Sequence, residues 1–208
     1  MKSAILGFLF VAASLWSDNA PDIALKKLME GNERFVKHQP NHPNQDLLRR
    51  ETITEKQEPF AVVVCCSDSR VAPEIIFDRG LGDTFVLRVA GNVIGELGLE
   101  SVRFGADTLN APLIMVLGHQ NCGAVKAVLE GGDSIRDIKA IAKKIEPVIQ
   151  EAKKMSGDQL MHAVELNAKA IKDRLVKDPL LSKFIKDGKL KIVAAYYDFE
   201  TGRVSLLD

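Results

Sequence analysis

Uninterrupted apolar runs and helically spaced apolar residues divide the chain into alternating strands and helices. Continuous runs at 60–66 and 112–119 predict strands that are buried on both faces, as in a parallel sheet. Another strand is predicted at 83–92, and the segment 190–207 predicts a strand, a turn at 200–202 and a short return strand. Apolar residues at helical spacing predict helices over 23–36, 97–109, 123–131, 135–154 and 160–176.

This alternation predicts an α/β fold: a central, mostly parallel β-sheet flanked by helices, with an N-terminal helical arm and a C-terminal strand or hairpin. The polar, proline-broken stretch at 38–46 is expected to be an arm that could wrap around a neighbouring subunit. A chain of 208 residues is long enough to bury one core, so we expect a single domain over 21–208.

The N-terminus has the pattern of a secretory signal peptide. Lys2 precedes an apolar stretch at 4–13, and small residues follow it. The apolar stretch is too short to span a membrane comfortably, so no stable membrane span is expected. Residues 1–20 are therefore predicted to direct export to the periplasm or the exterior. The alternative is a cytoplasmic protein whose first helix packs on the fold.

Composition narrows the function classes. Lys plus Arg and Asp plus Glu both number 28, so the formal net charge is zero. No basic block recurs along the chain, which argues against binding to nucleic acid. Three cysteines, two of them adjacent, are too few for a disulfide framework. Metal binding or redox chemistry is the better explanation for them.

Potential metal ligands follow two of the predicted strands. Cys66 ends the first apolar run, His119 ends another, and Cys122 opens the helix that follows. The carboxyl ends of parallel strands meet at one edge of a sheet, so these three side chains are expected to converge. Two thiolates and one imidazole form a zinc site with a fourth position left for water or substrate. Cys65 faces the other side of its strand and is expected to be a buried structural thiol.

The segments "CSDSR" and "GHQNCGA" resemble the motifs of the β-class carbonic anhydrases. The resemblance extends from about residue 23 to the segment "YYDFETGRV". It implies one Zn²⁺ per subunit, held by Cys66, His119 and Cys122. The implied reaction is the reversible hydration of carbon dioxide to bicarbonate and a proton by zinc-bound hydroxide. It also implies a homodimer or a higher even oligomer, with the substrate pocket at the subunit boundary.

The resemblance assigns roles to five further residues. Asp68 and Arg70 match the catalytic acid–base pair, and Arg70 can hold the Asp68 carboxylate off the metal through a bidentate contact. Gln57 matches a glutamine that hydrogen-bonds the substrate, and Phe85 matches an apolar wall of the carbon dioxide pocket. Gly123 follows the last metal ligand, at a position where a backbone amide can face the substrate.

The chain also departs from the family pattern at two positions. Ser101 follows Glu100 where plant-like members carry tyrosine, so one wall of the pocket differs. Val63 stands where members with an allosteric bicarbonate site carry tryptophan, although Arg88 and Tyr197 match the other two parts of that site. We therefore expect no strong closure of the site by bicarbonate.

Two alternative functions remain open from the residues. Related proteins of this fold hydrolyse carbonyl sulfide or carbon disulfide with the same zinc ligands, and pocket access rather than the motif would separate them. A protein of a different class, a zinc-storage or thiol-redox module, would use the same donors. Such a module has no need of the pair formed by Asp68 and Arg70.

Overall fold

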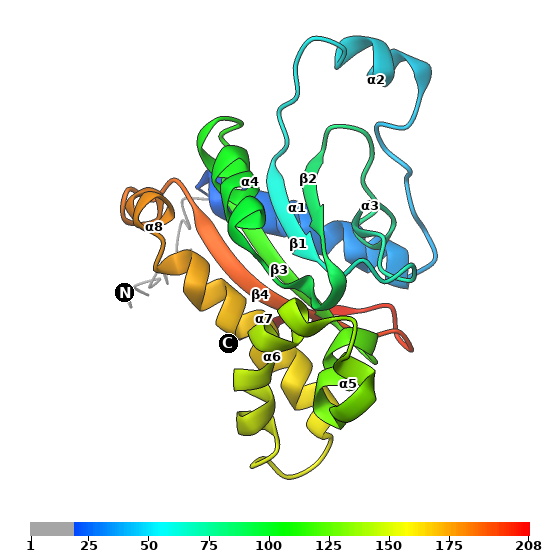
Figure 1. The fold of residues 1–208 in the computed structure, drawn as a ribbon. Helices are drawn as coiled ribbons and strands as arrows, with labels where there is room; N and C mark the ends of the chain where they lie inside the picture. The colour runs from blue at the N-terminus through cyan, green and yellow to red at the C-terminus, as the bar shows by residue number, and fades with distance from the viewer. Residues whose placement is uncertain (1–18) are drawn as a thin grey trace, which may run out of the picture.

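A five-stranded sheet forms the centre of the computed structural model, which describes residues 19–208 (Figure 1). Its strands are β1 (Ala61–Cys65), β2 (Thr84–Arg88), β3 (Leu113–His119), β4 (Lys191–Tyr197) and β5 (Val204–Leu207). They lie in the order β2-β1-β3-β4-β5; the first four are parallel, and β5 is antiparallel to β4. This arrangement confirms the predicted α/β fold and its C-terminal hairpin. Most of the predicted signal peptide lies outside the described residues.

Helices cover both faces of this sheet (Figure 1). They are α1 (Ala20–Val36), α2 (Leu47–Thr52), α3 (Pro73–Ile76), η1 (Ala90–Asn92), α4 (Glu96–Asp107), α5 (Gly123–Glu130), η2 (Gly132–Ile135), α6 (Lys139–Ala152), α7 (Gln159–Val176) and α8 (Pro179–Lys186). Alternate strand residues face opposite ways. Val63 and Met115 therefore enter a core against α1 and α3, whereas Val62 and Ile114 face α4, α7 and α8. A third apolar cluster lies among α5, α6 and α7.

Three short α-helices were absent from the sequence-based expectation. Helices α2 and α3 have six and four residues, too few to show an apolar period. Helix α8 begins with the cap Asp178 and with Pro179 in its first turn, a common start signal that lies just after the predicted end of α7. The helix predicted over 135–154 begins only at Lys139, because η2 occupies the residues up to Ile135.

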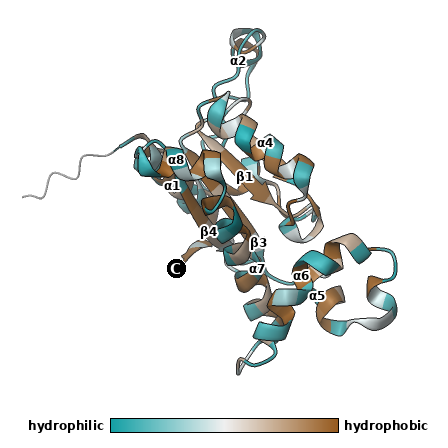
Figure 2. Ribbon diagram, turned by 60° about the vertical axis from the view of Figure 1, so that its left-hand side comes forward, coloured by the Kyte–Doolittle hydropathy of each residue, from teal (hydrophilic) through white to brown (hydrophobic). Residues whose placement is uncertain are grey.

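The arm at 38–46 is bound to its own subunit. Backbone N–H groups of Asn41 and His42 donate to the Asp78 carboxylate at 3.0 and 2.9 Å. The side chain of Asn44 donates to Asp83 at 2.7 Å. Helix α2, which has no buried residue, follows the arm and protrudes from the rest of the molecule (Figures 1 and 2). The contact of the arm with a neighbouring subunit stays a prediction.

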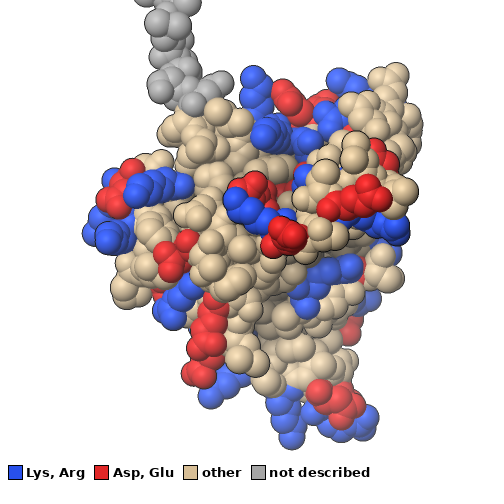
Figure 3. All heavy atoms as spheres, turned by 90° about the horizontal axis from the view of Figure 1, so that it is seen from above, with Lys and Arg blue, Asp and Glu red and all other residues tan. Residues whose placement is uncertain are grey.

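The surface carries charges of both signs. On the face shown in Figure 3, acidic and basic side chains are interspersed, in keeping with the balanced composition. Hydrophobic residues are instead concentrated on the strands (Figure 2). Among the described helices, none has both the length and the apolar character needed to cross a membrane.

Candidate metal centre

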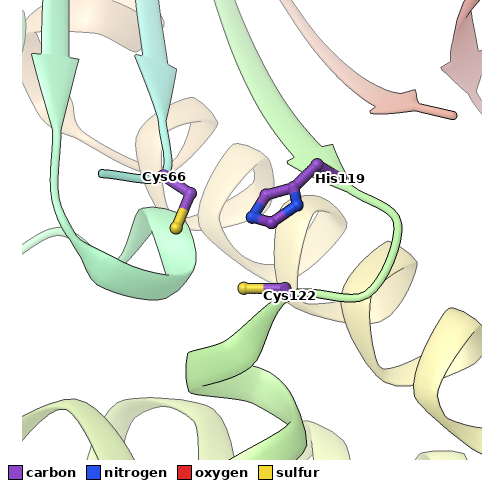
Figure 4. A group of neighbouring side chains, drawn as sticks. All are labelled: Cys66, His119 and Cys122. Carbon is purple, nitrogen blue, oxygen red and sulfur yellow. The ribbon is translucent and has the colours of Figure 1, made fainter. Parts of the chain in front are cut away.

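Cys66, His119 and Cys122 lie together at the carboxyl end of the sheet (Figure 4). Cys66 follows β1 and His119 ends β3, and these strands are parallel neighbours, so their ends meet. Cys122 is the N-cap of α5, after a turn in which Asn121 has a φ of 52°. The donor atoms of the three residues lie within 4.8 Å of one another, and all three residues are buried. The sheet therefore delivers two sulfurs and one imidazole to one point.

His119 presents an unpartnered ring nitrogen to this group. Its side chain is fully buried, and Nδ1 lies 2.9 Å from the backbone oxygen of Gln120. A carbonyl oxygen only accepts hydrogen bonds, so Nδ1 carries the proton and Nε2 carries the lone pair. Nε2 has no hydrogen-bond partner within the described part of the chain. Burial of such an atom is unfavourable unless something binds it, and a metal ion fits this requirement.

The two sulfurs differ in how readily they lose a proton. A hydrogen bond from Cys122 and the adjacent His119 ring, aided by the N–H groups of Asp68 and Gly91, lower the pKa of Cys66. The same contact with the Cys66 sulfur, together with burial, raises the pKa of Cys122. The two sulfurs thus titrate as a pair: one thiolate forms readily, and the second needs a cation beside it. This donor set suits zinc, which prefers thiolate and imidazole ligands.

Cys65 is not part of this group, although it is the next residue. Its side chain lies on the opposite face of the sheet, in the core that contains Leu28 and Phe77. Burial raises the pKa of Cys65 to about 12. A protonated thiol in that core is inert toward a metal ion. The alternation of side chains along a strand accounts for the different surroundings of these two adjacent cysteines.

The carboxylate of Asp68 lies beside the three donors and is held by Arg70. The guanidinium of Arg70 donates from Nε to Oδ1 at 2.9 Å and from Nη2 to Oδ2 at 2.7 Å. The Arg70 backbone N–H also donates to Oδ1, at 3.0 Å. These contacts lower the pKa of Asp68 to about 2, so its carboxylate is ionised at neutral pH. Oδ2 of Asp68 lies 3.9 Å from Nε2 of His119.

Arg70 is itself supported by the turns that follow β3 and β4. Its guanidinium lies 4.3 Å from the centre of the Phe199 ring, and Nη2 donates to the backbone oxygen of Asn121 at 3.4 Å. The backbone N–H of Phe199 donates to Oε1 of Gln120 at 2.9 Å. Sequence reasoning missed Phe199 and Gln120. Gln120 lies inside the segment "GHQNCGA", whereas Phe199 reaches the site only because β4 lies next to β3, and no local motif indicates that pairing.

Comparison with known proteins adds to this geometry. A family model described as carbonic anhydrase matches residues 61–204. Carbonic anhydrase 2 of Mycobacterium tuberculosis is 39% identical, over 90% of this chain and 93% of its own length. The carbonic anhydrase of Mycolicibacterium smegmatis is 40% identical, over 89% of this chain and 93% of its own length. The chain belongs to the carbonic anhydrase family.

Its class follows from the solved structures. The β-carbonic anhydrase CcaA superimposes with a TM-score of 0.72 at 25% identity, over 88% of this chain and 95% of that chain. The Coccomyxa β-carbonic anhydrase, solved with acetazolamide, gives a TM-score of 0.67 at 26% identity, over 88% of this chain and 86% of that one. The resemblance of "CSDSR" and "GHQNCGA" to the β class is therefore confirmed.

The residues expected to bind substrate in this β-carbonic anhydrase lie in different places. Gly123 is exposed beside Cys122, and a Cβ added there would meet no atom of the described chain within 4 Å. Gln57 is exposed on the loop between α2 and β1. Phe85 pairs in register with Val62, which precedes Cys66 by four residues, or about 13 Å along a strand. Within one subunit, Gly123 adjoins the metal donors and Phe85 does not.

Arg88 has a role that the family comparison did not suggest. It was matched only to a part of the allosteric bicarbonate site, for which Val63 is a mismatch. In the structure its guanidinium donates to the backbone oxygens of Cys66 at 3.2 Å and of Asp68 at 2.7 Å. Arg88 therefore braces the turn that carries both a metal donor and the carboxylate.

Proposed function

We propose that this carbonic anhydrase hydrates carbon dioxide reversibly to bicarbonate and a proton, with one zinc ion per subunit held by Cys66, His119 and Cys122. The observation that carries the proposal is the buried group of two sulfurs and one imidazole, in which His119 Nε2 lacks a partner in the described chain. Relatives that bear the name carbonic anhydrase over most of their length support it.

Zinc, when bound, lowers the pKa of a coordinated water so that hydroxide is available near neutral pH. The chain supplies the surroundings for that chemistry. Its three donors leave a fourth position for water or substrate. Asp68 Oδ2, at 3.9 Å from His119 Nε2, is placed to accept a hydrogen bond from the attacking oxygen. Such a bond orients the oxygen lone pair toward carbon dioxide.

The contact between Arg70 and Asp68 favours catalysis over zinc storage. A free carboxylate beside the donors would itself be a zinc ligand and would fill the fourth position. Arg70 occupies both oxygens of Asp68 and so keeps the carboxylate as a hydrogen-bond acceptor. A storage site gains nothing from an open position, whereas a catalytic site requires one. This difference also separates the proposal from a thiol-redox module, which has no use for the pair.

We further propose that the protein is a homodimer or a higher even oligomer that associates through β2 and α4. Strand β2 is an edge of the sheet, and Phe85, Leu97 and Phe104 line a shallow hollow beside it. Leu97 and Phe104 are 80% and 46% exposed. An open strand edge next to exposed apolar side chains is an association surface. A second copy seated there would bring its metal donors toward Phe85 of the first copy. The metal donors of the first copy lie far from that residue.

Light scattering of the fully active protein tests the oligomer. We expect at least twice the chain mass, and Phe104→Asp should lower the mass and the activity together. A strictly monomeric sample with full activity would contradict the proposal.

We propose that the protein is exported and that residues 1–20 are its signal peptide. The support is the sequence pattern of a positive residue, an apolar stretch and small residues. Fractionation of cells that express the whole chain or a chain starting at residue 21 tests this. Recovery of the intact, uncleaved protein from the cytosol would refute export.

The activity is tested by mixing the protein with a carbon dioxide solution and following the pH. Zinc-loaded protein should accelerate acidification, a chelator that strips the metal should abolish the effect, and added zinc should restore it. The same samples incubated with carbonyl sulfide and with carbon disulfide examine the closest alternative reactions. Zinc-loaded protein that leaves the hydration rate unchanged would refute the proposal.

A further inference from the structure

A buried amide lies behind the metal donors. Asn167 is on the inner face of α7 with 2% of its surface exposed, and the buried residues of that helix around it include Val164, Ala168 and Ile171. Its Nδ2 donates to the backbone oxygen of Gly91 at 2.8 Å. Burying an amide in an apolar layer is unfavourable unless it makes a hydrogen bond. The contact with Gly91 therefore accounts for a polar residue on this helix face.

Gly91 connects this amide to the metal site. Its backbone N–H donates to Sγ of Cys66 at 3.3 Å, while its carbonyl accepts the bond from Asn167. Its φ of 65° lies in the left-handed region that favours glycine. A Cβ there would lie 2.8 Å from Cδ1 of Ile145 and 3.3 Å from Cβ of Ala124. Both features favour glycine, and because glycine has many backbone conformations, contacts from outside η1 help to select this one.

The Cys66 sulfur has two backbone donors, which differ in how they are fixed. The N–H of Asp68, at 3.4 Å, belongs to the same turn as Cys66, and Arg88 braces that turn. The N–H of Gly91 comes from a different element, so its direction depends on how η1 sits against α7. Hydrogen bonds to a metal ligand set its orientation and its donor strength.

We propose that Asn167 is a positioning residue of the metal centre. By holding the Gly91 carbonyl it keeps the Gly91 N–H on the Cys66 sulfur, and so it sets the place and the donor strength of that thiolate. The inference rests on the proposed zinc site. It extends that site beyond its three donors to a residue of α7 that touches neither the metal nor the substrate.

Metal binding tests this with Asn167→Leu, which keeps the bulk but removes the amide. The matched control is Asn32→Leu on α1. Asn32 is also 2% exposed and also donates from Nδ2 to backbone oxygens, those of Ile76 at 3.2 Å and Gly202 at 2.9 Å. Two measurements are made on each protein. One is the zinc dissociation constant by competition with a coloured chelator, and the other is the thiolate-to-cobalt charge-transfer absorption after cobalt(II) substitution.

Asn167→Leu should weaken zinc binding by about tenfold or more and shift the charge-transfer band. Asn32→Leu should lower the melting temperature and leave both metal readouts at wild-type values. Asn167→Gln, which retains a donor, should recover part of the affinity. If Asn167→Leu does not fold, the smaller Asn167→Ser is measured in the same way. An Asn167 variant with wild-type affinity and spectrum would overturn the inference. A wild-type protein that binds neither metal would instead refute the proposed function.

Discussion

Two turns of this carbonic anhydrase each pair an aspartate with an arginine, and the two pairs have different surroundings. In the turn after β1, Arg70 holds Asp68 at 2.7 Å. In the turn after α3, Arg34 holds Asp78 at 2.6 Å. The chemistry of the contact is the same in both. Each carboxylate accepts three hydrogen bonds. What differs is whether the carboxylate can be reached by a further partner.

Asp78 cannot be reached in this way. Its side chain is 1% exposed, and the N–H groups of Asn41 and His42 add to the contact from Arg34. Burial raises the pKa of this carboxyl, but the hydrogen bonds from Asn41, Arg34 and His42 together outweigh burial and lower it. The carboxylate therefore fastens the arm at 38–46 to α1 and α3, and it is closed to any other partner.

Asp68 is open on one side. Its side chain is 15% exposed and faces the unpartnered Nε2 of His119. Arg70 is on the surface, with 53% of its side chain exposed, so solvent screens the pair and its contribution to stability is small. The comparison teaches that an Asp–Arg pair indicates function when unpartnered metal-ligating atoms lie next to it.

The largest expected effect comes from removing the two sulfurs beside Asp68. Within the described chain, the turn that carries Asp78 has no such sulfurs next to it. Cys66→Ser and Cys122→Ser should each abolish bound zinc and activity, because the two donors that remain are too few to hold the ion. Cys65→Ser should keep both, since its side chain lies in the core on the other face. Elemental analysis and the hydration assay measure the outcome. Loss of zinc in Cys65→Ser together with its retention in Cys66→Ser would reverse the assignment.

The next test exchanges the arginines of the two pairs for alanine. Arg70→Ala should lose roughly 100-fold in activity while zinc stays bound, because Asp68 is freed to turn onto the metal. Arg34→Ala should keep its activity per folded molecule and lower the free energy of unfolding by roughly 2 kcal/mol, because a buried carboxylate loses a charged donor. Steady-state kinetics and urea unfolding of both variants provide the measurements.

A double variant sharpens this result. Removing Asp68 as well as Arg70 should reopen the fourth metal position without restoring activity, because the oriented acceptor is also lost. Full recovery in the double variant would mean that Asp68 only obstructs the site. If Arg34→Ala instead lost activity at unchanged stability, the contrast between the two turns would be wrong.

The strands that build the site could be predicted because burial on both faces leaves a continuous apolar run. Strand β1 is buried along its whole length, as is β3, and each ends next to a polar turn with metal donors. The rule that parallel strands end at one edge then placed Cys66 near His119. The short helix α3 has four residues and could not be recognised, since one turn shows no period.

The supporting residues of the site could not be predicted in this way. Asn167 and Gly91 are 76 positions apart, and their contact exists only because α7 packs behind the end of the sheet. Phe199 reaches Arg70 through the pairing of β4 with β3, which no local pattern specifies. Local sequence therefore indicates the donors, whereas long-range packing decides what holds them. The role of Gln57 and the association of subunits stay predictions.

Acid should destabilise the fold through both aspartates. The pKa of each carboxyl is lowered in the folded state, that of Asp68 to about 2. Each aspartate therefore adds stability above an unfolded pKa of about 3.9, and this contribution is lost as the pH falls through the folded pKa. Urea unfolding between pH 3 and pH 7 should show a flatter decline of stability in Asp78→Asn and in Asp68→Asn than in the wild type. A wild-type slope in either variant would contradict the role given to that carboxylate.

The smallest expected effect concerns the ring beneath Arg70. Phe199 lies 4.3 Å from the guanidinium and restricts it to the side of the site where it meets Asp68. A cation over an aromatic face at an exposed site is a weak attraction, so its loss should loosen the pair without breaking it. Phe199→Leu should therefore lower kcat/KM by about threefold, at unchanged zinc content. Phe199→Tyr keeps an aromatic face and should behave as wild type. Equal kinetics for the leucine and tyrosine variants would show that Arg70 holds Asp68 without the ring, and that the two hydrogen bonds to the carboxylate are sufficient.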